Sequence, residues 1–97
     1  MDVAKRVIFH ITTELAWETA RRAGVYTGDS LESEGFIHCS TADQWEQVRK
    51  EWFPGRHDLV LLEIDPQLLH AEVRWEGGFP HLYGPLEAAA VVSARRL

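Results

Sequence analysis

The sequence predicts a single α+β domain, residues 1–97, in which strands and two to three helices are intermixed. Segments with period-two alternation, such as 6–12, are followed by segments with helical spacing, such as 13–24. No repeat, linker or low-complexity segment interrupts the chain, and 97 residues are enough for one hydrophobic core. We therefore expect one domain with mixed or antiparallel strands.

The first strand and the first helix are predicted from "RVIFHITTELAWETARRAG", residues 6–24. Its beginning is rich in β-branched and aromatic residues, which favour a strand. In an extended chain, Ile8, His10 and Thr12 share one face. Residues 13–24 change to helical spacing, with early glutamates, late arginines and a glycine as the stop.

A second strand, another helix and a third strand are predicted in the middle of the chain. Residues 35–40, "GFIHCS", form the second strand, and the pair Thr41 and Gln44 matches a capping box, so a helix is expected to begin at Thr41. Apolar residues recur along this helix at helical intervals: Trp45, Val48, Trp52 and Phe53. Residues 58–65, "DLVLLEID", are almost continuously apolar and predict a strand buried on both faces.

The last third of the chain is less regular in pattern. Residues 72–76, "EVRWE", alternate and predict a strand. Residues 77–87, "GGFPHLYGPLE", contain two prolines and three glycines, so we expect a structured loop there. Residues 88–97 are predicted to end the chain as a strand, with a helix as the alternative because of the alanines.

Composition excludes several classes of protein. The net charge of −5 argues against a nucleic-acid-binding surface, which is typically basic. One cysteine cannot form an internal disulfide, and no segment approaches the ~20 apolar residues of a membrane span. We expect a cytoplasmic protein with a small-molecule ligand, and the oligomeric state stays open.

A short pattern occurs twice: a histidine followed two residues later by a hydroxyl residue, near the end of a predicted strand. His10 and Thr12 form the first copy, and His38 and Ser40 form the second. If the two strands are neighbours, these polar side chains meet at the strand ends, where pockets form. Cys39 lies on the opposite face and is expected to be buried as a small apolar residue.

The third group of candidate residues lies in the predicted loop. Four large apolar or aromatic residues surround His81 and follow Glu76, so the loop either packs over the core or lines a site. In the second case Tyr83 stacks on a flat ligand and His81 donates a hydrogen bond. The histidines have no compact metal-ligand spacing, and we expect no metal site.

Three stretches together resemble a known family: "VIFHIT", "EGFIHCST" and "WEGGFPHLYGPL". In this order they resemble a small bacterial family catalogued as domain of unknown function 952, and the resemblance covers nearly the whole chain. That family is in turn similar to the ADP-ribosyltransferase fold, a split α+β sandwich that holds NAD in a cleft. His10 and Thr12 match a pattern that contacts NAD in such enzymes.

The resemblance implies a cleft that binds NAD, as ligand or substrate, or an ADP-ribose-like nucleotide. Glu76 and His38 are then the predicted catalytic residues, with Glu87 as the alternative acidic partner. The predicted ligand-binding residues are His10, Thr12, Ser40, His81 and Tyr83. Two alternatives stay open: a non-catalytic binding module that uses the same pocket, and a metal-assisted hydrolase built on the histidines and Glu76.

Overall fold

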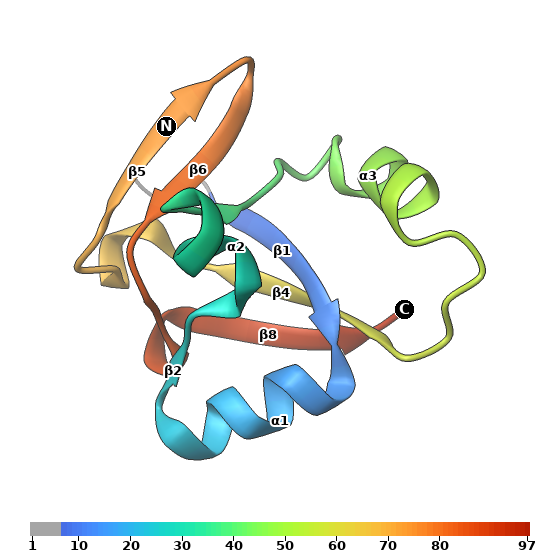
Figure 1. The fold of residues 1–97 in the computed structure, drawn as a ribbon, viewed down its shortest axis with the longest axis horizontal. Helices are drawn as coiled ribbons and strands as arrows, with labels where there is room; N and C mark the ends of the chain where they lie inside the picture. The colour runs from blue at the N-terminus through green and yellow to red at the C-terminus, as the bar shows by residue number, and fades with distance from the viewer. Residues whose placement is uncertain (1–6) are drawn as a thin grey trace.

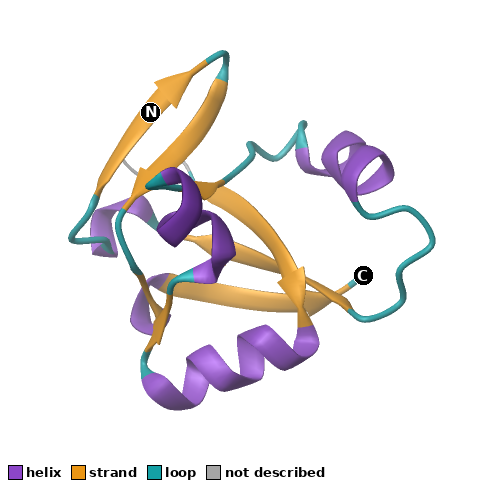
Figure 2. Ribbon diagram, viewed as in Figure 1, coloured by secondary structure: helices purple, strands orange, loops and turns teal. Residues whose placement is uncertain are grey.

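The computed structural model describes residues 7–97. In this range, three α-helices and eight strands are joined by short connections (Figures 1 and 2). In chain order the elements are β1 (Ile8–Thr13), α1 (Glu14–Ala23), β2 (Val25–Tyr26), α2 (Gly28–Glu34), β3 (Ile37–His38), α3 (Trp45–Trp52), β4 (Leu59–Ile64), the 3₁₀ helix η2 (Pro66–Leu68), β5 (Glu72–Glu76), β6 (Phe79–Tyr83), β7 (Leu86–Glu87), the 3₁₀ helix η3 (Ala88–Ala90) and β8 (Val91–Arg96). The predicted α+β class is confirmed.

The largest sheet has the order β1-β4-β8, and both of its pairings are antiparallel. Strand β4 is central, which explains its nearly continuous apolar sequence. Its residues Val60, Leu62 and Ile64 belong to one buried cluster, whereas Leu59 and Leu61 belong to a second. Because successive side chains of a strand point to opposite faces, the two clusters lie on opposite faces of this sheet.

One helix covers each face of the sheet. Helix α1 packs Ala16, Trp17 and Ala20 against the larger cluster. It begins where Thr13 Oγ1 accepts a hydrogen bond from Ala16 N at 3.0 Å and ends at Gly24, whose φ of 87° is left-handed. Helix α3 contributes apolar side chains to the second cluster on the other face.

Helix α3 begins at Trp45, so the prediction that it begins at Thr41 is wrong. Half of the predicted capping box is present, because Gln44 Oε1 accepts from Thr41 N at 2.9 Å. The Thr41 hydroxyl donates instead to Asp43 Oδ1 at 2.6 Å, and residues 42–44 form a turn. The contact between Thr41 and Gln44 therefore closes the turn that precedes the helix and does not cap the helix itself.

The prediction of a loop at residues 77–87 is also wrong, because this segment holds strands β6 and β7. Strands β5 and β6 form an antiparallel hairpin with a two-residue turn, Gly77 and Gly78, whose φ values are 61° and 84°. Two positive φ values are typical of a type I′ hairpin turn, and the dipeptide Gly-Gly is a sequence indicator of it. Figure 1 shows this hairpin projecting from the body of the molecule.

Pro80 lies within strand β6 and does not interrupt it. The pairing of β6 with its neighbouring strands explains why. In a strand, the N–H and C=O of one residue point to the same side. The Pro80 carbonyl accepts from Cys39 N at 3.1 Å, so the missing N–H would face the end of β3 rather than β5. The β5–β6 ladder therefore loses no hydrogen bond.

The two strands that carry the repeated histidine pattern are neighbours. Strand β3 belongs to a second antiparallel sheet of order β3-β6-β5, and β2 pairs with β7. An isolated bridge joins Phe9 to Ser40, with both N–H···O distances at 2.7 Å, and connects the two larger sheets. Within residues 7–97 no helix has the length and apolar character to span a membrane.

Candidate functional site

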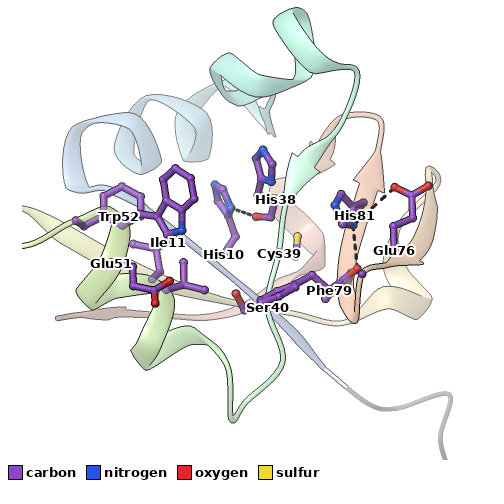
Figure 3. Close-up of a pocket in the computed structure, with 14 residues that line it drawn as sticks. His10, Ile11, His38, Cys39, Ser40, Glu51, Trp52, Glu76, Phe79 and His81 are labelled. Atoms are coloured by element: carbon purple, nitrogen blue, oxygen red, sulfur yellow. Dashed lines mark hydrogen bonds and ion pairs between the residues drawn. The ribbon is translucent and has the colours of Figure 1, made fainter.

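A cavity of about 500 Å³ lies between the edge of β1, the strands β3 and β6, and helix α3 (Figure 3). We call this cavity the cleft. Fourteen residues line it: His10, Ile11, His38, Cys39, Ser40, Val48, Glu51, Trp52, Phe53, Glu76, Gly77, Phe79, Pro80 and His81. The five predicted site residues His10, His38, Ser40, Glu76 and His81 are therefore brought together, although they come from four separate strand segments.

The cleft exists because two neighbouring strand segments diverge. Because the bridge between Phe9 and Ser40 is antiparallel, the residues that would extend it along β1 past Phe9 are 37–39. These residues pair with β6 and diverge from β1, so the edge of β1 is open from His10 onward. The N–H and C=O of Phe9 point away from β4 and bond to Ser40. Because backbone groups alternate in direction along a strand, the N–H and C=O of Ile11, two residues later, also point away from β4. Among residues 7–97, no backbone group pairs with this outward pair of Ile11.

His10 is fixed by hydrogen bonds at both ring nitrogens. Its Nδ1 lies 2.6 Å from the carbonyl oxygen of His38 and its Nε2 lies 2.9 Å from the hydroxyl of Tyr26. Because a carbonyl only accepts, Nδ1 carries the proton and Nε2 is the acceptor in the neutral ring. Burial lowers the pKa of His10 to about 4, so the ring is neutral near pH 7.

Thr12 does not reach the cleft. It is 7% exposed, and its hydroxyl lies 3.1 Å from the hydroxyl of Tyr26. Tyr26, which comes from β2 and packs in the larger cluster, thus fills the space between the two side chains of the first His-x-Thr copy. The predicted ligand contact of Thr12 is replaced in this structure by a contact within the protein.

Ser40 and Cys39 line the floor of the cleft. Ser40 is 6% exposed, and its backbone groups are both used in the bridge to Phe9. Burial raises the pKa of the Cys39 thiol to about 12, so the sulfur is a protonated, unreactive group at neutral pH. The expected burial of Cys39 is confirmed.

His38 and His81 lie directly opposite each other on the antiparallel strands β3 and β6, with ring centroids 6.0 Å apart. Phe36 packs against both rings in edge-to-face geometry, at 4.8 and 4.7 Å. His38 Nε2 lies 3.3 Å from Glu34 Oε1. The pair therefore forms a polar wall supported from beneath by one aromatic ring.

Glu76 faces this wall and is held in place by its neighbours on β6. Its Oε1 accepts from the Tyr83 hydroxyl at 2.7 Å and lies 4.0 Å from His81 Nδ1, an ion pair drawn in Figure 3. His81 Nδ1 also donates to the carbonyl of Phe79 at 2.8 Å. The carboxylate and the imidazole thus have a defined relative position at one end of the cleft.

Tyr83, the predicted stacking residue, does not line the cleft. It lies two residues beyond His81 on β6, which moves its ring about 7 Å along the strand. There it packs against Phe36 at 5.3 Å and below the guanidinium of Arg74 at 4.6 Å. The hydrogen bond to Glu76 and burial raise the pKa of Tyr83. The hydroxyl of Tyr83 therefore holds the carboxylate of Glu76 in position.

The two candidate acidic partners are separated by the fold. Glu87 lies on β7, and its Oε2 is 3.0 Å from Nδ1 of His70. It is not among the residues of the cleft, whereas Glu76 is. Of these two carboxylates, Glu76 is the one that can contact a ligand there.

Sequence reasoning missed three residues of α3 that line the cleft, Val48, Glu51 and Trp52. The helical spacing groups Trp52 with Trp45 and Val48. Helix α3 ends at Trp52, however, and the indole is 74% exposed. The Pro-Gly pair at residues 54 and 55 is the available indicator, because it predicts that the helix ends near Trp52.

Within residues 7–97, no group of three or more His, Cys, Asp and Glu side chains is arranged to hold a metal ion. The histidines of the cleft are paired instead with carbonyls, hydroxyls and carboxylates of the protein. The apolar surfaces and hydrogen-bonding groups that line the cleft are suited to an organic ligand.

Residues 11–94 match the model of a protein family described as Protein of unknown function (DUF952). The chain belongs to this family. The match spans all the cleft-lining residues except His10. No curated protein matches the chain.

Solved structures of one protein of similar sequence share the fold. The crystal structure of protein CC0527 from Caulobacter crescentus has a TM-score of 0.85 at 33% identity, and covers 94% of this chain and 85% of that one. The solution NMR structure of CC0527 has a TM-score of 0.80 at 32% identity, with 94% and 84% covered. The family and its solved fold are thus established, and its biochemical role has to be argued from the cleft.

Proposed function

We propose that the cleft binds NAD or an ADP-ribose-like nucleotide and that Glu76 and His38 act on the ribose. The observation that carries this proposal is the division of the cleft into two ends. One end has the open edge of β1 and an exposed indole, and the other has Glu76 next to His81. A nucleoside has the matching parts: a flat ring joined to a sugar with hydroxyl groups.

The size and composition of the cleft support a small organic ligand. Its volume of about 500 Å³ lies within the range of typical small-molecule sites. Apolar and aromatic side chains form most of the lining, and a few convergent polar groups interrupt them, as expected for a site that fixes the orientation of a ligand.

The outward N–H and C=O of Ile11 support recognition of an amide. A donor and an acceptor side by side on a strand edge form two hydrogen bonds with a primary carboxamide, which offers the complementary acceptor and donor. Nicotinamide carries such a group. This contact would set the ring at the end of the cleft that His10 and Trp52 also line.

The Glu76 end supports contact with ribose hydroxyls. A carboxylate accepts from hydroxyl groups, and charge makes such hydrogen bonds stronger than neutral ones. In transfer of an ADP-ribosyl group, positive charge develops on the sugar as the bond to the base breaks. A carboxylate held in advance by Tyr83 and His81 stabilises that charge at little reorganisation cost.

Binding is tested by thermal unfolding of the purified protein with NAD, ADP-ribose or nicotinamide. A ligand at about 100 times its dissociation constant stabilises the fold by about 2.7 kcal/mol. For a domain of this size, that corresponds to a rise of the melting temperature on the order of 10 °C. If millimolar NAD and ADP-ribose both leave the melting temperature unchanged, the proposal is wrong.

Catalysis is tested separately with Glu76→Gln, and Glu87→Gln is the matched control because Glu87 is the alternative acidic partner and lies outside the cleft. We expect Glu76→Gln to keep the thermal shift with NAD and to lose release of nicotinamide, while Glu87→Gln keeps both. If the unmodified protein binds the nucleotide and releases no nicotinamide with any acceptor offered, the non-catalytic binding module is the better description.

A further inference from the structure

Of the described tryptophan and phenylalanine side chains that line the cleft, Trp52 is the most exposed. It is 74% exposed, and it belongs to neither of the two buried clusters, although Trp45, Val48 and Phe53 around it pack against the second one. Figure 3 shows the indole at the same end of the cleft as His10 and Ile11. A flat ring placed there would have an aromatic face to stack on.

The charges of the cleft are the second observation. Two carboxylates line the cleft, those of Glu51 and Glu76. Among residues 7–97, no lysine or arginine lines it. Glu34 adds a third carboxylate 3.3 Å from His38. Such a surface stabilises positive charge and offers no strong cationic partner to a diphosphate.

Glu51 adds one of these charges to the wall of the cleft that Trp52 also lines, because both side chains reach the cleft from α3 (Figure 3). Its Oε2 accepts from Gln47 Nε2 at 2.8 Å, a neutral donor that leaves the negative charge of the carboxylate in place. A tryptophan face attracts cations through its quadrupole, and a nearby carboxylate attracts them through Coulomb interaction. Both effects favour a ring that is itself positively charged.

We propose that the cleft selects a cationic pyridinium nucleoside, with the charged ring stacked on Trp52 beside Glu51 and the ribose toward Glu76. This inference rests on the proposed function and narrows it: the nicotinamide riboside part of NAD is the recognised unit, and the phosphates contribute little to affinity. The ring in its oxidised form carries the charge, so the reduced dihydropyridine, which has almost the same shape and no charge, is rejected.

The test compares nicotinamide riboside, its dihydro form and ADP-ribose by calorimetric titration of the whole chain. Nicotinamide riboside should bind about 10-fold more tightly than the dihydro form. Truncation of Trp52 to alanine should weaken riboside binding about 10-fold, and Glu51→Gln should weaken it several-fold and reduce the preference for the oxidised ring. Trp75→Ala is the matched control, since Trp75 is 49% exposed and lies outside the cleft.

The outcomes separate the two proposals. If NAD or ADP-ribose binds and the oxidised and dihydro ribosides bind equally, or Trp52→Ala behaves as Trp75→Ala does, the pyridinium inference is overturned and the proposed nucleotide site stands. If none of the nucleosides and nucleotides binds, both are overturned. Because Trp52 is exposed, its variant should keep the melting temperature of the parent, which distinguishes lost affinity from lost folding.

Discussion

The two His-x-hydroxyl sequences have the same spacing and very different surroundings. On β1, His10 has protein partners at both ring nitrogens, and Thr12 is 7% exposed. At β3, the side chain of His38 is 57% exposed with a carboxylate beside it, and Ser40 lines the cleft. The first copy therefore holds the two sheets together, whereas in the second copy His38 is accessible to a ligand and Ser40, 6% exposed, contributes to the floor of the cleft.

The cause of this difference is the aromatic residue that accompanies each copy. Tyr26 contacts His10 with a hydroxyl at 2.9 Å, so the first imidazole is bonded into the interior. Phe36 packs against His38 with 4.8 Å between the ring centroids, and its side chain has no polar group that could bind the imidazole. A repeated pattern thus predicts which face a side chain lies on, whereas the neighbours from other elements determine what it does there.

The largest contrast is expected from alanine variants of the two histidines. We expect His10→Ala to lower the free energy of unfolding by about 3–4 kcal/mol, because it leaves the His38 carbonyl and the Tyr26 hydroxyl without a partner and opens a gap. His38→Ala should change it by less than about 0.5 kcal/mol, since that side chain is exposed. Urea unfolding of both variants measures the difference, and similar losses would contradict the division of roles.

The stability of the protein should depend on pH through the titration of His10. The pKa of His10 is about 4 in the folded chain and 6.5 in the unfolded chain, so the unfolded state binds a proton first as the pH falls. Between pH 6.5 and pH 4 the free energy of unfolding should therefore decrease by about 3 kcal/mol from this group alone. Above pH 6.5 the group should have no effect.

The control for this pH dependence is His10→Gln, whose amide can donate to the His38 carbonyl and accept from Tyr26 without titrating. The carboxylates and the other histidines are present in both proteins, so their contributions cancel in the comparison. We expect the curve of stability against pH to be flatter for the variant by about 3 kcal/mol across this interval. Parallel curves would show that His10 is accessible to protons in the folded state.

Much of the fold follows from the sequence because local pattern and tertiary environment agree there. The apolar run of β4 predicts a central strand, and the capped amphipathic segment of α1 predicts its helix, and both are confirmed. Strand β6 was missed because Pro80 and the glycines were weighed as strand breakers. Whether a proline breaks a strand depends on the direction of its missing N–H, which only the pairing with Cys39 determines.

Phenylalanine variants of the two tyrosines should also differ in stability, by less than the histidine variants do. Tyr26→Phe should lower the free energy of unfolding by about 1–2 kcal/mol, since the buried Nε2 of His10 loses its donor and Thr12 loses a partner. Tyr83→Phe should change stability by less than about 0.5 kcal/mol, because its bond to Glu76 is exposed to solvent. If the proposed function is correct, Tyr83→Phe acts on nicotinamide release instead, by loosening Glu76.

Local sequence pattern predicts some residues of the candidate site and misses others. The repeated histidine spacing indicated side chains on one face of each strand, and the fold brings these segments to one cavity. Trp52 was not among the predicted site residues, because helical periodicity does not reveal which side chain of a helix faces a cavity. Tyr83 was assigned to the ligand because its distance from Glu76 along the hairpin cannot be read from a segment taken to be a loop.

The smallest expected effects come from the two hydroxyl residues, and here stability and binding should separate. Thr12→Val keeps the side-chain volume and removes the contact with Tyr26, so we expect a loss of about 1 kcal/mol of stability and unchanged ligand binding. Ser40→Ala should leave stability within about 0.5 kcal/mol, since both of its backbone hydrogen bonds remain, and should weaken a ligand that contacts the floor of the cleft. Melting temperatures measured with and without nicotinamide riboside give both quantities in one experiment. If Thr12→Val reduces the ligand-induced shift more than Ser40→Ala does, the first copy of the pattern belongs to the site after all, and the assignment of the two copies has to be reversed.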